Sequence, residues 1–299
     1  MTRDVGRSVA GTLEVVDVVA LGDTGPYAVA FGPAGDMWVT LVETGELLRR
    51  SPDGSERRFA IGARPGQLAV ARDAVWCAVT GEDRIAVVAG DEISFVDAPG
   101  GPYGMAVAGD GVWTGLMQGD ALARLGSRGP RLDVPLPVDG AFPAMIAVDE
   151  DDAVWVSLNQ AGALARRSPA GDLDLVRLPV GAAPVGIATA AGQVWAADIA
   201  GGRILLVDPI RHVREFTLDP ESRPHAVIAD EDGCWFTEWG ANRLGRITLD
   251  GQVTEFDLSG GGEEPHGLAR DRHGDVWVAF ESGAVAGYRP STTERSGAS

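Results

Sequence analysis

Residues 264–281 read EPHGLARDRHGDVWVAFE, and this order of residue types recurs along the chain. Each copy has a proline, a variable residue, a small or apolar pair, a polar turn, and then an apolar residue followed by tryptophan. The prolines are Pro26, Pro65, Pro102, Pro143, Pro184, Pro224 and Pro265, and the tryptophans are Trp38, Trp76, Trp113, Trp155, Trp195, Trp235 and Trp277. Seven copies that begin 37 to 41 residues apart indicate a repeat protein in which each copy is one structural unit.

Each repeat contains the pattern of four short strands. Alternating runs such as GLAR, DVWVAF and GAVAGY are bounded by turns with Gly and Asp, which is typical of antiparallel hairpins. Small sheets arranged radially leave only short edges. The sequence therefore predicts an all-β protein, a seven-bladed β-propeller with four-stranded blades.

The two ends of the repeat array favour a propeller over the alternative, a β-solenoid. The last repeat ends after AVAGYRP without an outer strand, whereas residues 12–21, TLEVVDVVAL, resemble an outer strand but precede the first repeat. We expect this N-terminal strand to complete the last blade and close the ring. The single domain, 1–299, then has blades at about 22–63, 64–100, 101–140, 141–181, 182–221, 222–261 and 262–290 plus 12–21, followed by a flexible tail at 291–299.

Composition and charge exclude several classes of protein. The N-terminus has no apolar signal region and no stretch is long enough to span a bilayer, so we expect a cytoplasmic protein without membrane association. The net charge is −18, and the 25 basic residues are scattered arginines, which argues against nucleic acid as a partner. Cys77 and Cys234 lie in different repeats, and we expect two buried thiols.

The residue after each proline begins an innermost strand and should line one mouth of the central channel. Apolar or small residues occupy three of these positions, and the other four carry aromatic or imidazole rings. The full set is Tyr27, Gly66, Tyr103, Ala144, Val185, His225 and His266. Polar groups are therefore expected to converge on one side of the mouth.

The following hairpin strand should return acidic residues to this mouth. We expect Glu281 opposite His266 and Glu238 opposite His225, with Glu264 just before the strand and Trp239 beside it. Tyr27, Tyr103, His225, Glu238 and Trp239 are the candidate substrate-binding residues. The other two histidines, His212 and His273, are expected to be ordinary surface residues.

Two carboxylates in an open polar mouth suit a hard divalent cation such as Mg²⁺. A neutral histidine beside them can act as a general base, which indicates proton abstraction next to a carbonyl group. No Ser-His-Asp arrangement or phosphate-binding loop is recognisable.

The segments 224–226 (PHA) with 235–239 (WFTEW), and 264–267 (EPHG) with 277–281, resemble the streptogramin B lyases, also called virginiamycin B lyases. The resemblance covers all seven repeats. It implies a propeller enzyme that opens cyclic depsipeptide antibiotics by Mg²⁺-dependent elimination and so causes antibiotic resistance. Carried over by position, it makes Glu264 and Glu281 the metal ligands, His266 the catalytic base and His225 a second active-site histidine, and Tyr27 matches an aromatic residue at the mouth.

Two other functions remain open from the sequence. A metal-dependent lactonase would hydrolyse an ester, although such propellers usually have six blades and more Asp and Asn ligands. A propeller without catalytic activity would serve as a binding platform. In each case we expect a monomer, because a closed ring needs no partner, and the physiological substrate stays open.

Overall fold

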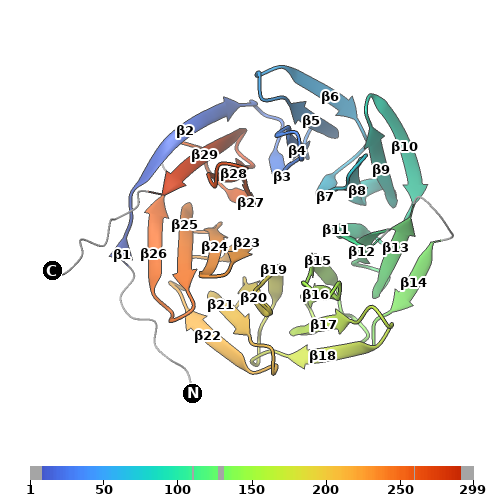
Figure 1. The fold of residues 1–299 in the computed structure, drawn as a ribbon, viewed down its shortest axis with the longest axis vertical. Helices are drawn as coiled ribbons and strands as arrows, with labels where there is room; N and C mark the ends of the chain where they lie inside the picture. Colours follow the sequence, from blue (N-terminus) through green and yellow to red (C-terminus); the bar gives the residue numbers. More distant parts are fainter. Residues whose placement is uncertain (1–8, 110, 127–130, 259, 291–299) are drawn as a thin grey trace.

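The computed structural model describes residues 9–109, 111–126, 131–258 and 260–290, which form a ring of seven sheets around a central axis (Figure 1). The first three blades contain, from the inner strand outward, β3 (Pro26–Phe31), β4 (Met37–Leu41), β5 (Glu46–Arg50) and β6 (Glu56–Ala60); β7 (Pro65–Val70), β8 (Val75–Val79), β9 (Arg84–Ala89) and β10 (Glu92–Asp97); and β11 (Pro102–Ala108), β12 (Gly111–Leu116), β13 (Ala121–Gly126) and β14 (Leu132–Pro135).

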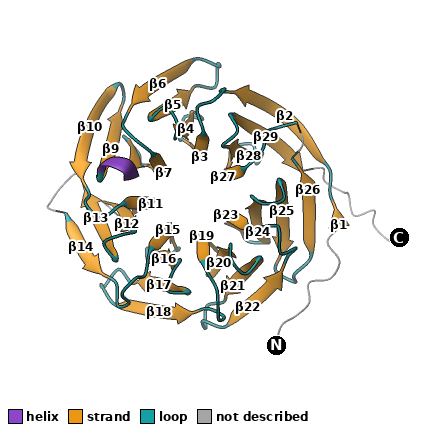
Figure 2. Ribbon diagram, turned by 180° about the vertical axis from the view of Figure 1, so that it is seen from behind, coloured by secondary structure: helices purple, strands orange, loops and turns teal. Residues whose placement is uncertain are grey.

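Blades four to six follow the same order. Their strands are β15 (Pro143–Val148), β16 (Val154–Leu158), β17 (Ala163–Arg167) and β18 (Leu173–Arg177); β19 (Pro184–Ala190), β20 (Gln193–Asp198), β21 (Arg203–Val207) and β22 (Val213–Thr217); and β23 (Pro224–Asp230), β24 (Gly233–Glu238), β25 (Arg243–Thr248) and β26 (Val253–Asp257). The described residues contain one helical turn, η1 (Thr80–Glu82), drawn in purple in Figure 2. No helix among them is both long and apolar enough to cross a membrane.

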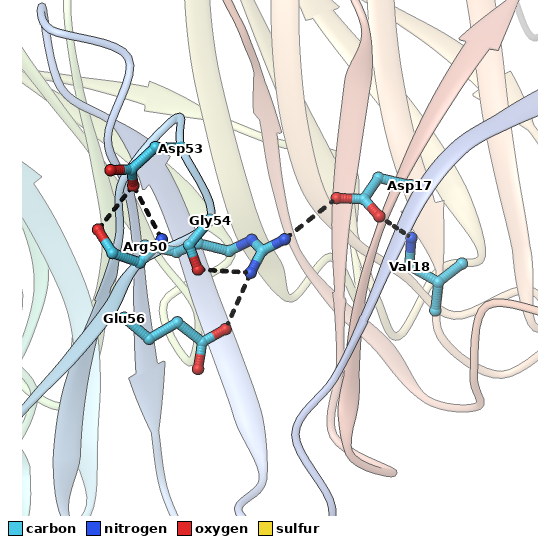
Figure 3. A network of polar contacts seen from close by, with 7 residues as sticks. Asp17, Val18, Arg50, Asp53, Gly54 and Glu56 are labelled. Carbon is cyan, nitrogen blue, oxygen red and sulfur yellow. Dashed lines mark hydrogen bonds and ion pairs between the residues drawn. The ribbon is translucent and has the colours of Figure 1, made fainter.

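The seventh blade closes the ring with the N-terminal strand. It consists of β27 (Pro265–Arg270), β28 (Val276–Phe280), β29 (Ala284–Pro290) and β2 (Leu13–Ala20), with β2 antiparallel to β29. Arg50 of blade one lies 3.7 Å from Asp17 in β2 and adds an ion pair between blade one and the outer strand of blade seven (Figure 3). The prediction of a seven-bladed propeller closed in this way is confirmed. The predicted tail at 291–299 lies outside the described residues.

One additional strand was not expected. β1 (Val9–Ala10) pairs in parallel with β26, so that the sheet of blade six has five strands. The N-terminal segment thereby contacts two neighbouring blades.

The apolar cores of the described residues lie between neighbouring blades rather than at one centre. Trp195, for example, is fully buried in a cluster with Phe216 of its own blade and Phe236 of the next. The repeated tryptophans are buried in six blades and Trp277 is half-buried, which fits the large contact area that this side chain provides. Both cysteines, Cys77 and Cys234, are free and buried in these cores, as expected.

The inner strand of each blade has a β-bulge directly after its proline. In blade seven Pro265 pairs with Phe280, but Leu268 pairs with Val278, so two residues of β27 oppose one residue of β28. A bulge redirects side chains locally. The bulge therefore decides where the residue after each proline points.

Candidate active site

Three rings from three different blades meet at one mouth of the channel. The ring centroids of His225 and His266 are 4.7 Å apart with perpendicular planes. Tyr27 of blade one lies 4.7 Å from His266 and 6.1 Å from His225. The two histidines are 6 to 8% exposed and Tyr27 is half-buried, so the three rings form the floor of the mouth.

Tyr103 extends this ring cluster beside Tyr27, and Trp239 extends it beside His266. The hydroxyl groups of Tyr27 and Tyr103 are 2.5 Å apart, and the Tyr103 hydroxyl also bonds to Gln67. Trp239 lies 5.9 Å from His266 between ring centroids. The structure thus brings together five of the residues that the sequence singled out.

Two acidic residues, Glu281 and Glu264, lie beside His266. Nε2 of His266 is 2.7 Å from Oε2 of Glu281. Neither ring nitrogen of His266 makes a regular hydrogen bond within the described part of the chain. Glu264, which is exposed, is held next to Glu281 because the Glu281 N–H donates to the Glu264 carbonyl at 3.1 Å.

The predicted register of these acids was wrong by two residues for Glu281 and by one residue for Glu238. Glu281 faces Glu264 rather than His266, and Glu238 pairs with Pro224 rather than His225. The bulge after the proline adds a residue to the inner strand and accounts for one residue of each shift. In blade seven the turn contributes the other residue, because Leu268 pairs with Val278. The side chain of Glu281 still reaches His266, with Oε2 2.7 Å from Nε2.

Glycines allow the blades to approach closely at this mouth. A Cβ atom on Gly267, directly after His266, would lie 2.4 Å from the carbonyl oxygen of Tyr27, and one on Gly186 would lie 2.2 Å from that of His225. Any larger residue would push the neighbouring blade away. The close approach keeps the rings of blades seven and one in contact.

Glu264 has a left-handed backbone with φ of 59°, which can signal functional strain in a residue other than glycine. Here the same conformation precedes the proline of other blades, at Arg64, Phe142 and Arg223. The positive φ of Glu264 therefore belongs to the turn that leads into an inner strand.

Both histidines are kept neutral by burial. Burial, with the nearby charge of His225, lowers the pKa of His266 to about 3. Burial also lowers the pKa of His225 to about 4, opposed by a hydrogen bond with the His266 backbone. A neutral imidazole with an unshared ring nitrogen can accept a proton from a ligand at the mouth.

Burial also changes the pKa values of Glu281 and Tyr27, which lie next to His266. Burial, followed by the charges of Glu264 and Glu43, raises the pKa of Glu281. Burial, followed by the interaction with Tyr103, raises the pKa of Tyr27 well above its usual value. Tyr27 and Tyr103 therefore stay protonated and can donate hydrogen bonds. The carboxylates of Glu264 and Glu43 place negative charge around Glu281.

This negative charge fits a divalent cation. No group of three His, Cys, Asp or Glu side chains is ready to hold a metal in the described residues. Mg²⁺ commonly binds through one or two carboxylates and keeps several waters. Glu264 and Glu281 could supply two such carboxylates, and a cation held by both would offset their repulsion.

Open space lies on either side of the acidic pair. A groove of about 690 Å³ runs past Glu281 and is bordered by Glu43 and Arg64. A second depression of about 430 Å³ lies beside Glu264 and is lined by Trp239 and Arg223, among others. Within the channel the cavity measures only about 130 Å³, so a bulky ligand is confined to the mouth.

Glu238 is the one candidate that the structure does not bring to the mouth. Its side chain is fully buried and neither carboxylate oxygen has a hydrogen-bond partner among the described residues. Burial, with the charge of Glu255, raises its pKa to about 7. Its pairing with Pro224 turns it into the blade, where other blades have Leu41 or Phe280.

Sequence reasoning missed Glu43 and Gln67, which act on Glu281 and Tyr103 from blades one and two. Neither residue occupies the position directly after a proline, and a repeat pattern gives no reason to choose them. His212 and His273, expected on the surface, are exposed.

Comparisons with known proteins agree with this geometry. The model of the virginiamycin B lyase family matches residues 14–288. A virginiamycin B lyase of Nocardia farcinica is 41% identical over 229 residues, which cover 74% of this chain and 78% of that protein.

Solved structures give the same result. The virginiamycin B lyase of Staphylococcus aureus superposes with a TM-score of 0.87 at 26% identity, covering 92% of this chain and 99% of that one. A streptogramin B lyase gives 0.86 at 28% identity, covering 93% and 97%. A catalytically inactive histidine-to-alanine variant of the Staphylococcus aureus enzyme with quinupristin gives 0.84 at 26% identity, covering 91% and 98%. This chain therefore belongs to the virginiamycin B lyase family and is a lyase.

Proposed function

We propose that this enzyme linearises cyclic type B streptogramin depsipeptides by elimination at the threonine ester. The observation that carries the proposal is the neutral His266, whose ring nitrogens lack regular hydrogen bonds within the described chain and lie at an open mouth beside Glu281. A related structure contains quinupristin bound to a variant inactivated at one histidine, which supports both the substrate class and a histidine in the chemistry.

His266 accepts the proton from the threonine α-carbon, which is acidified by the adjacent carbonyl group. The electron pair left on that carbon forms a double bond to the β-carbon, the bond from the β-carbon to the ester oxygen breaks, and the carboxylate leaves. No water is consumed. The Glu281 carboxylate, 2.7 Å from Nε2, stabilises the imidazolium that forms.

Glu264 and Glu281 hold Mg²⁺ in this proposal. When bound there, the ion supplies Lewis-acid polarisation of the carbonyl group next to the abstracted proton. His225 and Tyr27 orient the substrate against His266, with Tyr103 holding the Tyr27 hydroxyl and Trp239 offering an aromatic face. Glu238 takes no part because it is buried away from the mouth.

The enzyme acts as a monomer in the cytoplasm in this proposal. Strand β2 already completes blade seven, so ring closure needs no second chain. The two free thiols are typical of a reducing compartment. The net charge of −18 argues against nucleic acid or an anionic membrane as a partner.

Product mass distinguishes elimination from the lactonase alternative. After incubation with a type B streptogramin and Mg²⁺, the linear product should have the same mass as the cyclic substrate and contain a dehydrated threonine. Deuterium at the threonine α-carbon should slow the reaction if proton removal limits its rate. A product heavier by one water, with an intact threonine hydroxyl, contradicts the elimination mechanism, and absence of any turnover contradicts type B streptogramins as the substrate.

A further inference from the structure

The two active-site histidines lie on the bulges of adjacent blades. In blade six, His225 and Ala226 together oppose the single residue Thr237, and in blade seven His266 and Gly267 oppose Ala279. Bulged residues are outside the regular ladder of strand hydrogen bonds. Something else must hold the backbone of each bulge, or the rings would not keep one orientation.

The hydroxyl group of Thr237 connects both bulges. The Ala226 N–H donates to Thr237 Oγ1 at 2.9 Å, and the same hydroxyl donates to the carbonyl oxygen of His266 at 3.3 Å. Thr237 is fully buried, so water does not replace these bonds readily. One side chain thus links the residue after His225 to the backbone of His266.

Blades five and seven are joined to the next blade without a hydroxyl group at this position. Two residues after the repeated tryptophan, blades five and seven have Ala197 and Ala279, which carry no hydroxyl. There the glycine of the bulge, Gly186 or Gly267, allows direct approach of the next backbone. The junction between blades six and seven has Ala226 in place of that glycine and depends on the Thr237 hydroxyl.

Blade four has the same kind of hydroxyl link, but the residues that it connects are not in the active site. The Met145 N–H donates to Ser157 Oγ at 3.0 Å, and the Ser157 hydroxyl donates to the Val185 carbonyl at 2.6 Å. Ser157 is also fully buried. The residues that it holds, Ala144 with Met145 and Val185, have no ionisable side chain, so this junction is a matched control within the same chain.

We infer that Thr237 is a positioning residue that sets the spacing and orientation of His225 and His266. This inference rests on the proposed function of the site for its kinetic consequence, but the geometry itself can be tested separately. The role follows because the His266 carbonyl, held by Thr237, also interacts with the His225 ring. Loss of the hydroxyl leaves the Ala226 N–H buried without its acceptor and releases both bulges.

The test compares Thr237→Val, which keeps the shape but removes the hydroxyl, with Thr237→Ser, which keeps the hydroxyl, and with Ser157→Ala. Displacement of reacting groups by about 1 Å can lower a rate by roughly 10²-fold. We expect Thr237→Val to lower kcat by about tenfold or more with KM little changed. Thr237→Ser should restore most of kcat, and Ser157→Ala should keep the wild-type value at a similar loss of melting temperature.

Histidine ring resonances provide the measurement that does not depend on activity. The chain has four histidines, and Thr237→Val should shift the signals of His225 and His266 while those of His212 and His273 stay in place. Ser157→Ala should shift none of them. If Thr237→Val does not fold, Thr237→Ala serves as the second hydroxyl-free variant.

The possible outcomes separate this inference from the proposed function. Unchanged histidine signals in folded Thr237→Val, or equal losses of kcat in Thr237→Val and Ser157→Ala, overturn the positioning role. If the wild type does not open streptogramins, the proposed function fails, while the resonance shifts still decide whether Thr237 positions the histidines.

Discussion

Two sides of the same channel mouth have the same backbone and different chemistry. In blades four and five the residues after the proline are Ala144 and Val185, whereas in blades six and seven they are His225 and His266. All four follow a proline on a bulged inner strand. The repeat therefore supplies equivalent positions around the axis, and only the side chains placed there make one side reactive.

Replacing His266 with Ala is the strongest way to remove the difference between the two sides. We expect turnover of a type B streptogramin to fall by roughly 10²-fold or more, because a positioned general base typically contributes this much. Val185→Ala, at the equivalent position of blade five, should keep the wild-type rate. Turnover is measured from the appearance of the linear product, and folding is checked by circular dichroism. A near wild-type rate for folded His266→Ala would falsify its role as the base.

A second pair of equivalent positions sharpens the comparison between blades five and six. Asp198 pairs with Pro184, and its oxygens accept bonds from Ala183, Gly201 and Arg203. The equivalent Glu238 has no such partners among the described residues. These two buried acids should therefore affect stability in opposite ways.

The pH dependence of Glu238 follows from its pKa, which is about 7 in the folded chain against a usual value of 4.5. Between these values the unfolded chain binds fewer protons, so this group lowers the free energy of unfolding as pH rises from about 4.5 to 7. Glu238→Gln should then be more stable than wild type at pH 8, by up to about 3 kcal/mol, and similar at pH 4.

Urea unfolding at several pH values measures this effect, with Asp198→Asn as the contrasting variant. Removing the carboxylate of Asp198 should destabilise the protein at pH 8 by about 1–3 kcal/mol, because buried donors lose their acceptor. Parallel stability curves for wild type and Glu238→Gln across this pH range would contradict an ionising buried carboxyl group at position 238.

Acidic residues lie at both ends of the inner hairpins in blades six and seven, but only Glu264 and Glu281 lie at the mouth. Glu264→Gln and Glu281→Gln should each weaken Mg²⁺ binding by at least about tenfold. Even residues that only hydrogen-bond to a metal ligand commonly contribute that much to metal affinity. Glu231→Gln, in the exposed turn at the other end of blade six, should bind Mg²⁺ like wild type. Calorimetric titration with Mg²⁺ alone decides this, and equal affinities in all four proteins would remove the metal from the proposed site.

The smallest effect is expected at the ion pair between blade one and the outer strand of blade seven, shown in Figure 3. Arg50 lies 3.7 Å from Asp17 and 3.1 Å from Glu56, and these side chains are partly exposed. Arg50→Ala should lower the free energy of unfolding by no more than about 1 kcal/mol. Arg211→Ala, which loses an exposed pair with Asp174 between blades four and five, should behave alike. A loss of several kcal/mol for Arg50→Ala alone would mean that the junction between blades seven and one depends on this ion pair.

The sequence alone determined the blade count, the closure by residues 12–21 and the shared position of His225 and His266. These features depend on a local pattern, because a proline and a tryptophan at constant spacing recur in each unit. Tertiary structure decided the rest. The bulge moved Glu238 into the blade, and contacts between residues far apart in sequence brought Glu43 to Glu281 and Thr237 to His266. Such contacts depend on how blades dock against one another, and a repeat period carries no information about that docking.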